Sequence, residues 1–456
     1  MTDCRSPLVC AALSGMKPTL LPLYFDPGRD EGFDSQLRLL QDLFGSETEF
    51  LSPLPLGSSL PDADAVIFPQ LLGEAYRRLE EFQKIKIPLL VVTSEFGTTA
   101  MWDWELIDYL RSAGVTTFAP YDLEQMRKII SALRVRRELA ETKFVVYQDN
   151  PGQGQQAPIF KRFYWWEQEC TLRMSSKFGI KIEKRSFREL GSRSAVISDD
   201  RAIQTHNEWR LPTENLSATA LNNATKLYLA IRDDLEHEDD HIGAVGVNCL
   251  NESHFSNTTP CLAWNRLYME NGMIWGCEGD TVSMLTKFIL HRVLGVPILM
   301  TNLYPFLMGN AALKHERIPN FPTNVKGDPQ NYILVAHCGF MGVIPQPFAT
   351  EWKLAKKVLG IVHEEASAID ARLPEGKITL AKMHSDFDRL TVAEGELEGY
   401  AQYPGSDCLN GGIIRVSDGP RLMQRLASHH YLLMTGSQLS QIETVAPIFD
   451  LSVESL

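Results

Sequence analysis

Four polar residues in or beside apolar stretches carry the kinds of side chain that bind a divalent metal ion. Glu278 lies in WGCEGD, Asn302 in VPILMTNLY, His337 in ILVAHCG, and His430 in a histidine pair. A carboxylate, an amide oxygen and two imidazoles suit Mn²⁺ or Mg²⁺. Each residue alone also has an ordinary explanation, such as a charge at a helix start for Glu278 or a buried core position for His337. Their wide separation along the chain is typical of an open catalytic site.

Other polar residues follow a predicted buried strand in the middle of the sequence. Asn248, Asn251 and Glu252 come directly after the run AVGV, and Asp280 stands two residues after Glu278 at the start of a predicted helix. In open α/β sheets, ligands collect outside the carboxyl ends of strands and near helix N-termini. We therefore expect these side chains to lie near a bound ligand.

Apolar strands alternate with amphipathic helices in the first two thirds of the chain. In the first part, this pattern predicts strands at 19–24, 63–69 and 87–97 and helices at 34–45, 74–85 and 102–114. Such alternation predicts a parallel sheet covered on both faces, a doubly wound domain. After residue 306 the pattern changes to short strands separated by glycine and proline turns, which predicts a β-rich, barrel-like domain.

We expect two or three domains in the 456 residues, since one hydrophobic core does not grow to this size, and the strand and helix pattern favours three. The predicted ranges are an N-terminal Rossmann-like α/β domain at 1–142, a second α/β domain at 143–305 and a β-rich C-terminal domain at 306–456. The second domain is expected to carry Glu278 and Asn302, and the third His337 and His430.

The composition narrows the classes of function. Hydrophobic residues make up 44% and charged residues 22%, as in ordinary globular enzymes, and the formal net charge is −13. A negative surface repels phosphate backbones and anionic lipids, so we expect neither a nucleic acid nor a membrane as partner. The eight cysteines show no CxxC spacing, which favours reduced thiols and the cytoplasm. Dinucleotide, P-loop, nucleophile-elbow and HExxH motifs are absent from the sequence.

After about residue 16 the chain resembles the L-fucose isomerase and L-arabinose isomerase family. The motifs that carry the resemblance are Cys-Glu-Gly-Asp at 277–280, a strand ending at 302, Ala-His-Cys-Gly at 336–339, Thr-Leu-Ala at 379–381 before Glu-Gly-Glu at 394–396, and His429-His430 followed by Gly436. The resemblance implies two Rossmann-like domains followed by a β-rich domain, with a Mn²⁺ (or Mg²⁺ or Co²⁺) site between the second and third. It also implies a homo-oligomer, a hexamer, in which a neighbouring N-terminal domain helps close a sugar pocket.

The resemblance also implies a reaction, the interconversion of an aldose and a ketose through a cis-enediol. By this mapping Glu278 is a metal ligand and the catalytic acid/base, His430 is a ligand, and His337 ligates or orients the sugar. The family carries a second catalytic, metal-binding carboxylate where this chain has Asn302. An amide offers a neutral oxygen to a metal but cannot exchange a proton near neutral pH. Asp280, Glu252 or a metal-bound water could take the role of that carboxylate.

Further residues are candidates for binding the sugar. Trp102 and Trp104 follow a strand-end loop in the first domain, where the resemblance implies a pocket wall, and indole faces stack well on sugars. Packing inside a helix explains the same two residues equally well. With Asn248, Asn251, Glu252 and His429, they complete the expected substrate contacts.

Two alternatives to the isomerase remain open. A sugar-binding relative without catalysis would follow from the missing carboxylate at Asn302. A metal-assisted epimerase or isomerase of an anionic sugar, carrying phosphate or sulfonate, would use the basic and aromatic segment at 161–166. An amphipathic helix with a basic edge explains that segment as well.

Overall fold

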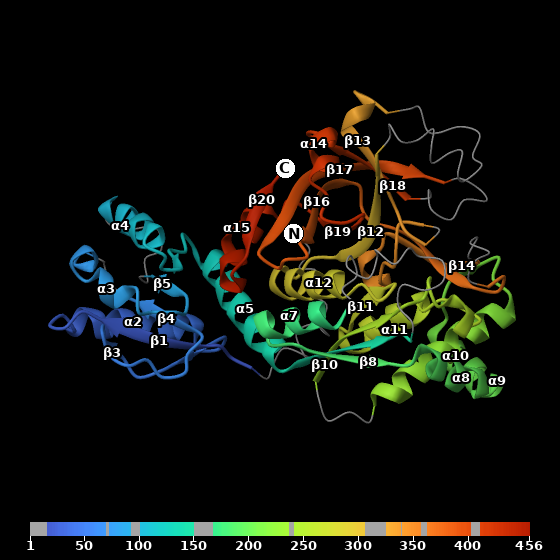
Figure 1. The fold of residues 1–456 in the computed structure, drawn as a ribbon, viewed down its shortest axis with the longest axis horizontal. Helices are drawn as coiled ribbons and strands as arrows, with labels where there is room; N and C mark the ends of the chain where they lie inside the picture. The colour runs from blue at the N-terminus through green and yellow to red at the C-terminus, as the bar shows by residue number, and fades with distance from the viewer. Residues whose placement is uncertain are drawn as a thin grey trace.

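The computed structural model describes residues 16–69, 73–92, 101–149, 167–236, 241–305, 325–338, 340–356, 363–402 and 411–456, with side chains from 104 onward in the third of these ranges. Within them the chain forms a mixed α/β structure with two parallel-strand sheets and a closed antiparallel barrel of six strands. The first sheet lies to one side of the molecule in Figure 1, and the second sheet lies beneath the barrel.

The first sheet is parallel, as the alternating sequence pattern predicts. Its strand order is β2-β1-β4-β5-β6, with β3 also paired to β1. The strands are β1 (Thr19–Tyr24), β2 (Glu49–Phe50), β3 (Leu54–Pro55), β4 (Ala65–Phe68), β5 (Leu89–Val91) and β6 (Thr117–Phe118). The longer helices are α2 (Glu31–Phe44), α4 (Met101–Ser112) and α5 (Leu123–Ala140).

The helix predicted at 74–85 does not form as one element. A 3₁₀ turn, η1 (Ala75–Arg77), and a short helix, α3 (Leu79–Phe82), stand in its place. Between them Arg78 has a φ of −120°, and its guanidinium donates hydrogen bonds to Glu81 and to the carbonyl of Leu56. The helical sequence pattern is therefore overridden by a tertiary contact with the chain that follows β3.

The second sheet is also parallel, with the order β11-β10-β7-β8. Its strands are β7 (Thr142–Tyr147), β8 (Lys181–Arg185), β10 (His241–Val247) and β11 (Ile274–Cys277). Its helices are α7 (Gln168–Phe178), α8 (Phe187–Val196), α9 (Asp199–Trp209), α10 (Ala218–Leu235), α11 (Cys261–Asn271) and α12 (Thr281–Leu294). The carboxyl ends of β7, β10 and β11 lie in register, so polar residues that follow these strands gather at one edge.

The barrel has the strand order β16-β19-β12-β13-β18-β17 and closes through pairing of β16 with β17. Its strands are β12 (Ile298–Pro305), β13 (Tyr332–Ala336), β16 (Gly376–Met383), β17 (Arg389–Ala401), β18 (Gly411–Val416) and β19 (His430–Thr435). The strand β12 was expected in the second α/β domain, but it hydrogen-bonds to β13 and β19 of the barrel. Its continuous apolar sequence resembles a strand buried in a parallel sheet because both of its faces are covered here too.

Smaller elements surround these sheets. A three-stranded sheet joins β9 (Thr213–Glu214), β14 (Glu351–Lys356) and β15 (Ser367–Arg372), and β20 (Ser452–Ser455) runs parallel to β17. The remaining elements are α14 (Gly419–Gln424), α15 (Leu439–Val445), η2 (Ser253–Phe255), η4 (Pro329–Asn331), η5 (Gln346–Phe348) and η6 (Ala446–Phe449).

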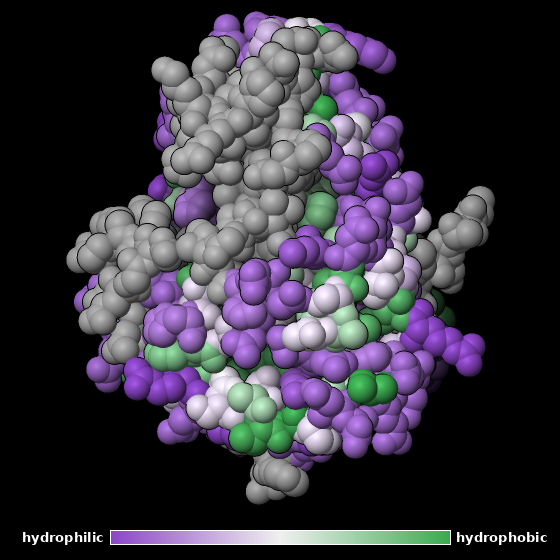
Figure 2. Space-filling model, turned by 90° about the vertical axis from the view of Figure 1, so that its right-hand side faces the viewer, coloured by the Kyte–Doolittle hydropathy of each residue, from purple (hydrophilic) through white to green (hydrophobic). Residues whose placement is uncertain are grey.

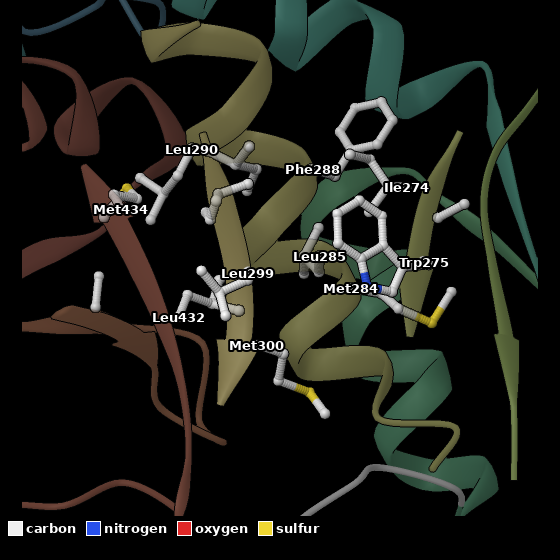
Figure 3. Close-up of a cluster of buried hydrophobic side chains, with 14 of the residues drawn as sticks. Ile274, Trp275, Met284, Leu285, Phe288, Leu290, Leu299, Met300, Leu432 and Met434 are labelled. Carbon is white, nitrogen blue, oxygen red and sulfur yellow. The ribbon is translucent and has the colours of Figure 1, made fainter. Parts of the chain in front are cut away.

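Helix α12 fixes the second sheet against the barrel, because all 14 of its residues are buried. Asp280 caps its first turn by accepting a hydrogen bond from the backbone N–H of Ser283, and Gly295 ends it in the left-handed region. Figure 3 shows this helix between strand β11, which carries Ile274 and Trp275, and the barrel strands β12 and β19. Burial of this apolar surface sets the position of the residues at the N-terminal end of α12.

The surface agrees with the composition. Figure 2 shows a face on which polar side chains dominate the described part, with hydrophobic side chains in small separate groups. Among the described residues, no helix has both the length and the apolar character that a membrane crossing requires. The five described cysteines carry thiol groups, and four of them are buried.

Candidate metal centre

Glu278 lies in a tight turn between β11 and α12. Its backbone is in the left-handed region, with a φ of 57°, and Gly279 follows with a φ of 68°. Because a side chain disfavours this conformation by about 1–2 kcal/mol, the surrounding structure must hold it. The N–H of Asp280 closes the turn by donating to the carbonyl of Cys277 at 3.1 Å. The turn places a buried carboxylate at the end of the second sheet.

Both candidate histidines come from the barrel. His337 directly follows β13, and His430 is the first residue of β19. Strand β12 lies between these two strands, and its Asn302 is paired across the ladder with His430 on one side and Ala336 on the other. Directly opposite residues of an antiparallel pair point to the same face, so Asn302 and His430 are neighbours.

The structure brings Glu278, His337 and His430 together from three separate strands. The Oε1 atom of Glu278 lies 3.3 Å from Nε2 of His337 and 3.8 Å from Nε2 of His430. One ligand atom from each of the three residues lies within 4.8 Å of the other two, and all three side chains are buried. Ligand atoms bound to one divalent ion at about 2.1 Å are about 3–3.5 Å apart, so small shifts would let this set hold an ion.

The charges of these groups are strongly coupled. Burial raises the pKa of the Glu278 carboxyl, but contact with His337 and the charges on His430 and His337 outweigh it and lower that pKa to about 2. Burial lowers the pKa of His337, but Cys338 and Glu278 outweigh this effect and raise it to about 10. Glu278 and His337, 3.3 Å apart, therefore each favour the charged form of the other.

Asn302 contributes a buried amide oxygen beside the cluster. Its Nδ2 donates a hydrogen bond to the hydroxyl of Tyr304 at 3.1 Å, while its Oδ1 is buried and accepts none from the part of the chain that the structure describes. A buried amide oxygen without a donor is costly unless a ligand, ion or water satisfies it. This oxygen, next to a Glu/His/His set, fits a fourth contact to a hard cation.

Two expected sugar contacts are instead held by other protein groups. Glu252 accepts hydrogen bonds from the backbone N–H of Asp149 with both carboxylate oxygens, at 3.0 Å each, and from Nδ2 of Asn248 at 3.2 Å. Asn248, Asn251 and Glu252 are all buried. Cys249, which lies between Asn248 and Asn251 in the chain, interacts with the backbone and the charge of Glu278, so this segment lies close to the candidate metal centre. Burial raises the pKa of the Cys249 thiol.

The remaining expected sugar contacts divide into one near the cluster and one on helix α4. The ring of His429 lies against that of His430, with centroids 4.3 Å apart, and burial together with the charge of His430 lowers its pKa to about 3. Trp104 lies on α4 with 41% of its surface exposed. The side chain of Trp102 and the segment 161–166 lie outside the described part.

Two residues of the centre were not singled out as supporting groups in the sequence. Asp280 accepts a hydrogen bond from Nδ1 of His430 at 2.9 Å, and Lys382 on β16 lies with its Nζ 3.2 Å from the same carboxylate. The capping pattern Asp280-x-x-Ser283 marks the first, but it points to a helix start and not to His430. Lys382 stands in an ordinary strand pattern, Leu-Ala-Lys-Met, and carries no signal.

Comparison of the sequence with known protein families gives no match, and no curated protein is detectably similar to it.

Proposed function

We infer that the chain is a divalent-metal-dependent isomerase that interconverts an aldose and a ketose. The observation that supports this best is the gathering of Glu278, His337 and His430 within 4.8 Å of one another at the junction of a parallel sheet and a barrel. Mn²⁺ is the ion we favour, with Mg²⁺ or Co²⁺ as alternatives, because the set mixes imidazole with carboxylate and amide oxygen.

The residues of the site would share the work of binding and proton transfer. Glu278, His337, His430 and Asn302 would hold the ion, which when bound supplies the positive charge that stabilises developing negative charge on two sugar oxygens. Glu278, a buried carboxylate held ionised by its neighbours, would take the proton from C2 of the aldose and return it to C1, while the O2 hydroxyl proton would pass to O1. His429, beside His430, would contact the sugar.

The larger organisation belongs to the same proposal. Three domains, the first two of Rossmann-like form, would place the site between the second and third, with strand β12 counted in the third because it pairs within the barrel. The parallel order of both sheets supports this division. A hexamer and a sugar pocket wall made by Trp102 and Trp104 of a neighbouring subunit follow from the family resemblance alone, and a cytoplasmic location follows from the cysteine pattern.

A binding protein without catalysis is the second candidate, and a specific observation favours it. Asn302 stands where a second carboxylate would be needed, and its amide cannot transfer a proton near neutral pH. The carboxylates of Asp280 and Glu252, the nearest replacements, accept hydrogen bonds from other protein groups. Such a protein would keep the metal and the sugar but exchange protons slowly.

Solvent deuterium separates the two candidates. The metal-free protein is incubated in D₂O with a panel of aldoses, with and without Mn²⁺, and deuterium at C1 and C2 is measured by NMR. Metal-dependent incorporation supports the isomerase, and it should vanish in Glu278→Gln. Glu138→Gln is the matched control, because Glu138 is also a buried carboxylate but lies on α5 beside Arg292, outside the centre. Sugar binding with neither deuterium incorporation nor formation of the ketose would replace the isomerase by the binding protein.

A further inference from the structure

Lys382 is a fully buried lysine whose ammonium group faces the first turn of helix α12, next to the candidate metal centre. It lies on the barrel strand β16, and its side chain is 1% exposed. Its Nζ is 3.2 Å from Oδ2 of Asp280 and also donates a hydrogen bond to Oγ of Ser283. Burying an ammonium group is costly unless it is paired and hydrogen-bonded, so this position requires both acceptors.

The two carboxylate oxygens of Asp280 interact with donors from three elements, α12, β16 and β19. Oδ1 accepts from the backbone N–H of Ser283 at 2.7 Å. Oδ2 accepts from Oγ of Ser283 at 2.7 Å and from Nδ1 of His430 at 2.9 Å, in addition to the contact with Lys382. The Asp280 side chain is completely buried, so water does not compete for these oxygens. Its orientation is therefore set by the protein alone.

This arrangement determines which nitrogen of His430 faces the cluster. A carboxylate oxygen can only accept, so the proton lies on Nδ1, and Nε2 is the nitrogen that points toward Oε1 of Glu278 at 3.8 Å. Histidine ligands of metals commonly donate their other N–H to a carboxylate, which fixes the ring orientation and tautomer.

We propose that Lys382 is a positioning residue of the metal centre: by holding Asp280 and Ser283 in place it keeps His430 turned so that Nε2 faces Glu278 and the metal. The inference rests on the proposed function, because it assigns Lys382 a part in metal binding. It differs from a purely structural ion pair, which would stabilise the fold and leave the affinity for metal unchanged.

The test compares two buried lysines. Lys382→Met removes the ammonium and keeps the stem, and Lys287→Met is the matched control. Lys287 is also fully buried and lies on α12, but its Nζ contacts the ring and carbonyl of Trp275 instead of Asp280. Mn²⁺ binding to the metal-free proteins is measured by calorimetry. We expect a dissociation constant 10–100-fold larger in Lys382→Met and unchanged in Lys287→Met.

A second variant and a spectroscopic readout cover the case in which Lys382→Met fails to fold. Ser283→Ala removes the hydroxyl between Lys382 and Asp280 without leaving a buried charge unpaired, and we expect several-fold weaker Mn²⁺ binding. In metal-free protein with ¹⁵N-labelled histidine, Nδ1 of His430 should carry a proton held in the hydrogen bond to Asp280, and the ¹⁵N shift and exchange protection of this Nδ1–H should change in the two variants.

The outcomes separate this inference from the proposed function. If the unmodified protein does not bind Mn²⁺, both are overturned. If it binds Mn²⁺ and the folded Lys382→Met and Ser283→Ala variants bind equally well, Lys382 is only structural and the proposed function stands. Equal losses in Lys382→Met and Lys287→Met would also overturn the inference, since the effect would then come from disturbing the core around α12.

Discussion

Replacing Asn302 tests whether its amide oxygen belongs to the metal centre, and the structure predicts an ordered series. Asn302 is paired with His430 across the barrel ladder, which places its Cβ about 5 Å from that of His430. Its Oδ1 is buried and accepts no hydrogen bond within the described residues. If this oxygen is a ligand, Mn²⁺ should bind most weakly to Asn302→Ala, more tightly to the unmodified protein and most tightly to Asn302→Asp.

The size of the gain follows from the charge that the substitution adds. Even at about 5 Å, which is longer than a ligand contact, and an effective dielectric constant of about 20, a carboxylate and a divalent cation attract by about 7 kcal/mol. Burying the new carboxylate costs several kcal/mol. A net gain of about 1.5–3 kcal/mol remains, which corresponds to a dissociation constant about 10–100-fold smaller.

The same substitution should have the opposite effect without metal. The new carboxylate would lie near that of Glu278, and their repulsion is only partly offset by His337 and His430. We therefore expect the melting temperature of Asn302→Asp to be lower than that of the unmodified protein in EDTA and higher in excess Mn²⁺. Calorimetry measures the affinities for Mn²⁺, and thermal unfolding measures whether the order of the two melting temperatures reverses between EDTA and Mn²⁺. Equal affinities across the series would remove Asn302 from the coordination sphere and refute the reasoning.

Two further predictions concern the structure around the centre. Burial lowers the pKa of His291 from 6.5 to about 4, and its Nδ1 donates to the carbonyl of Val296. Since unfolding restores the ordinary pKa, neutral His291 contributes to stability above about pH 6.5, and up to about 3 kcal/mol of the free energy of unfolding is lost as the pH falls toward 4. Denaturant unfolding of His291→Gln should show a smaller loss of stability over this pH range. In the barrel, a Cβ at Gly411 would lie 1.8 Å from the carbonyl oxygen of Val335, so Gly411→Ala should lower the free energy of unfolding by about 3 kcal/mol or more. Gly73→Ala is the control, because open space surrounds Gly73, and it should change the free energy of unfolding little. Equal unfolding midpoints for these two variants would contradict the barrel register.

Local patterns were enough to predict much of the architecture. The alternation of apolar strands and helices predicted the parallel sheets, and the glycine- and proline-separated strands after residue 306 predicted a barrel. The predicted helix start at Asp280 agrees with the observed N-cap of α12. The assignment of β12 failed because a continuous apolar run does not show which sheet buries it. Only pairing with β13 and β19, a long-range property, decides that.

The candidate site was predictable in residue type but not in its supporting contacts. A carboxylate before a helix and histidines beside apolar runs are local signals, and they led to Glu278, His337 and His430. Lys382 gave no signal, because a lysine in a strand usually faces water, and only closure of the barrel turns it toward Asp280. Contacts of this kind depend on register and cannot be read from spacing.

The supporting contacts also limit the chemistry that the site can perform. Asp280 accepts hydrogen bonds from Ser283 and His430 and lies against Lys382, and Glu252 is held by the backbone of Asp149, so neither carboxylate is placed to exchange a proton with a sugar. If the chain is the proposed isomerase, proton transfer would therefore fall to Glu278 among the described residues of the centre. In a cis-enediol the two carbons are adjacent, and one base on one face can serve both. A proton carried by one buried carboxylate exchanges slowly with solvent, so the isomerised sugar should carry less than one deuterium per turnover, whereas full incorporation would require a second, solvent-connected acid.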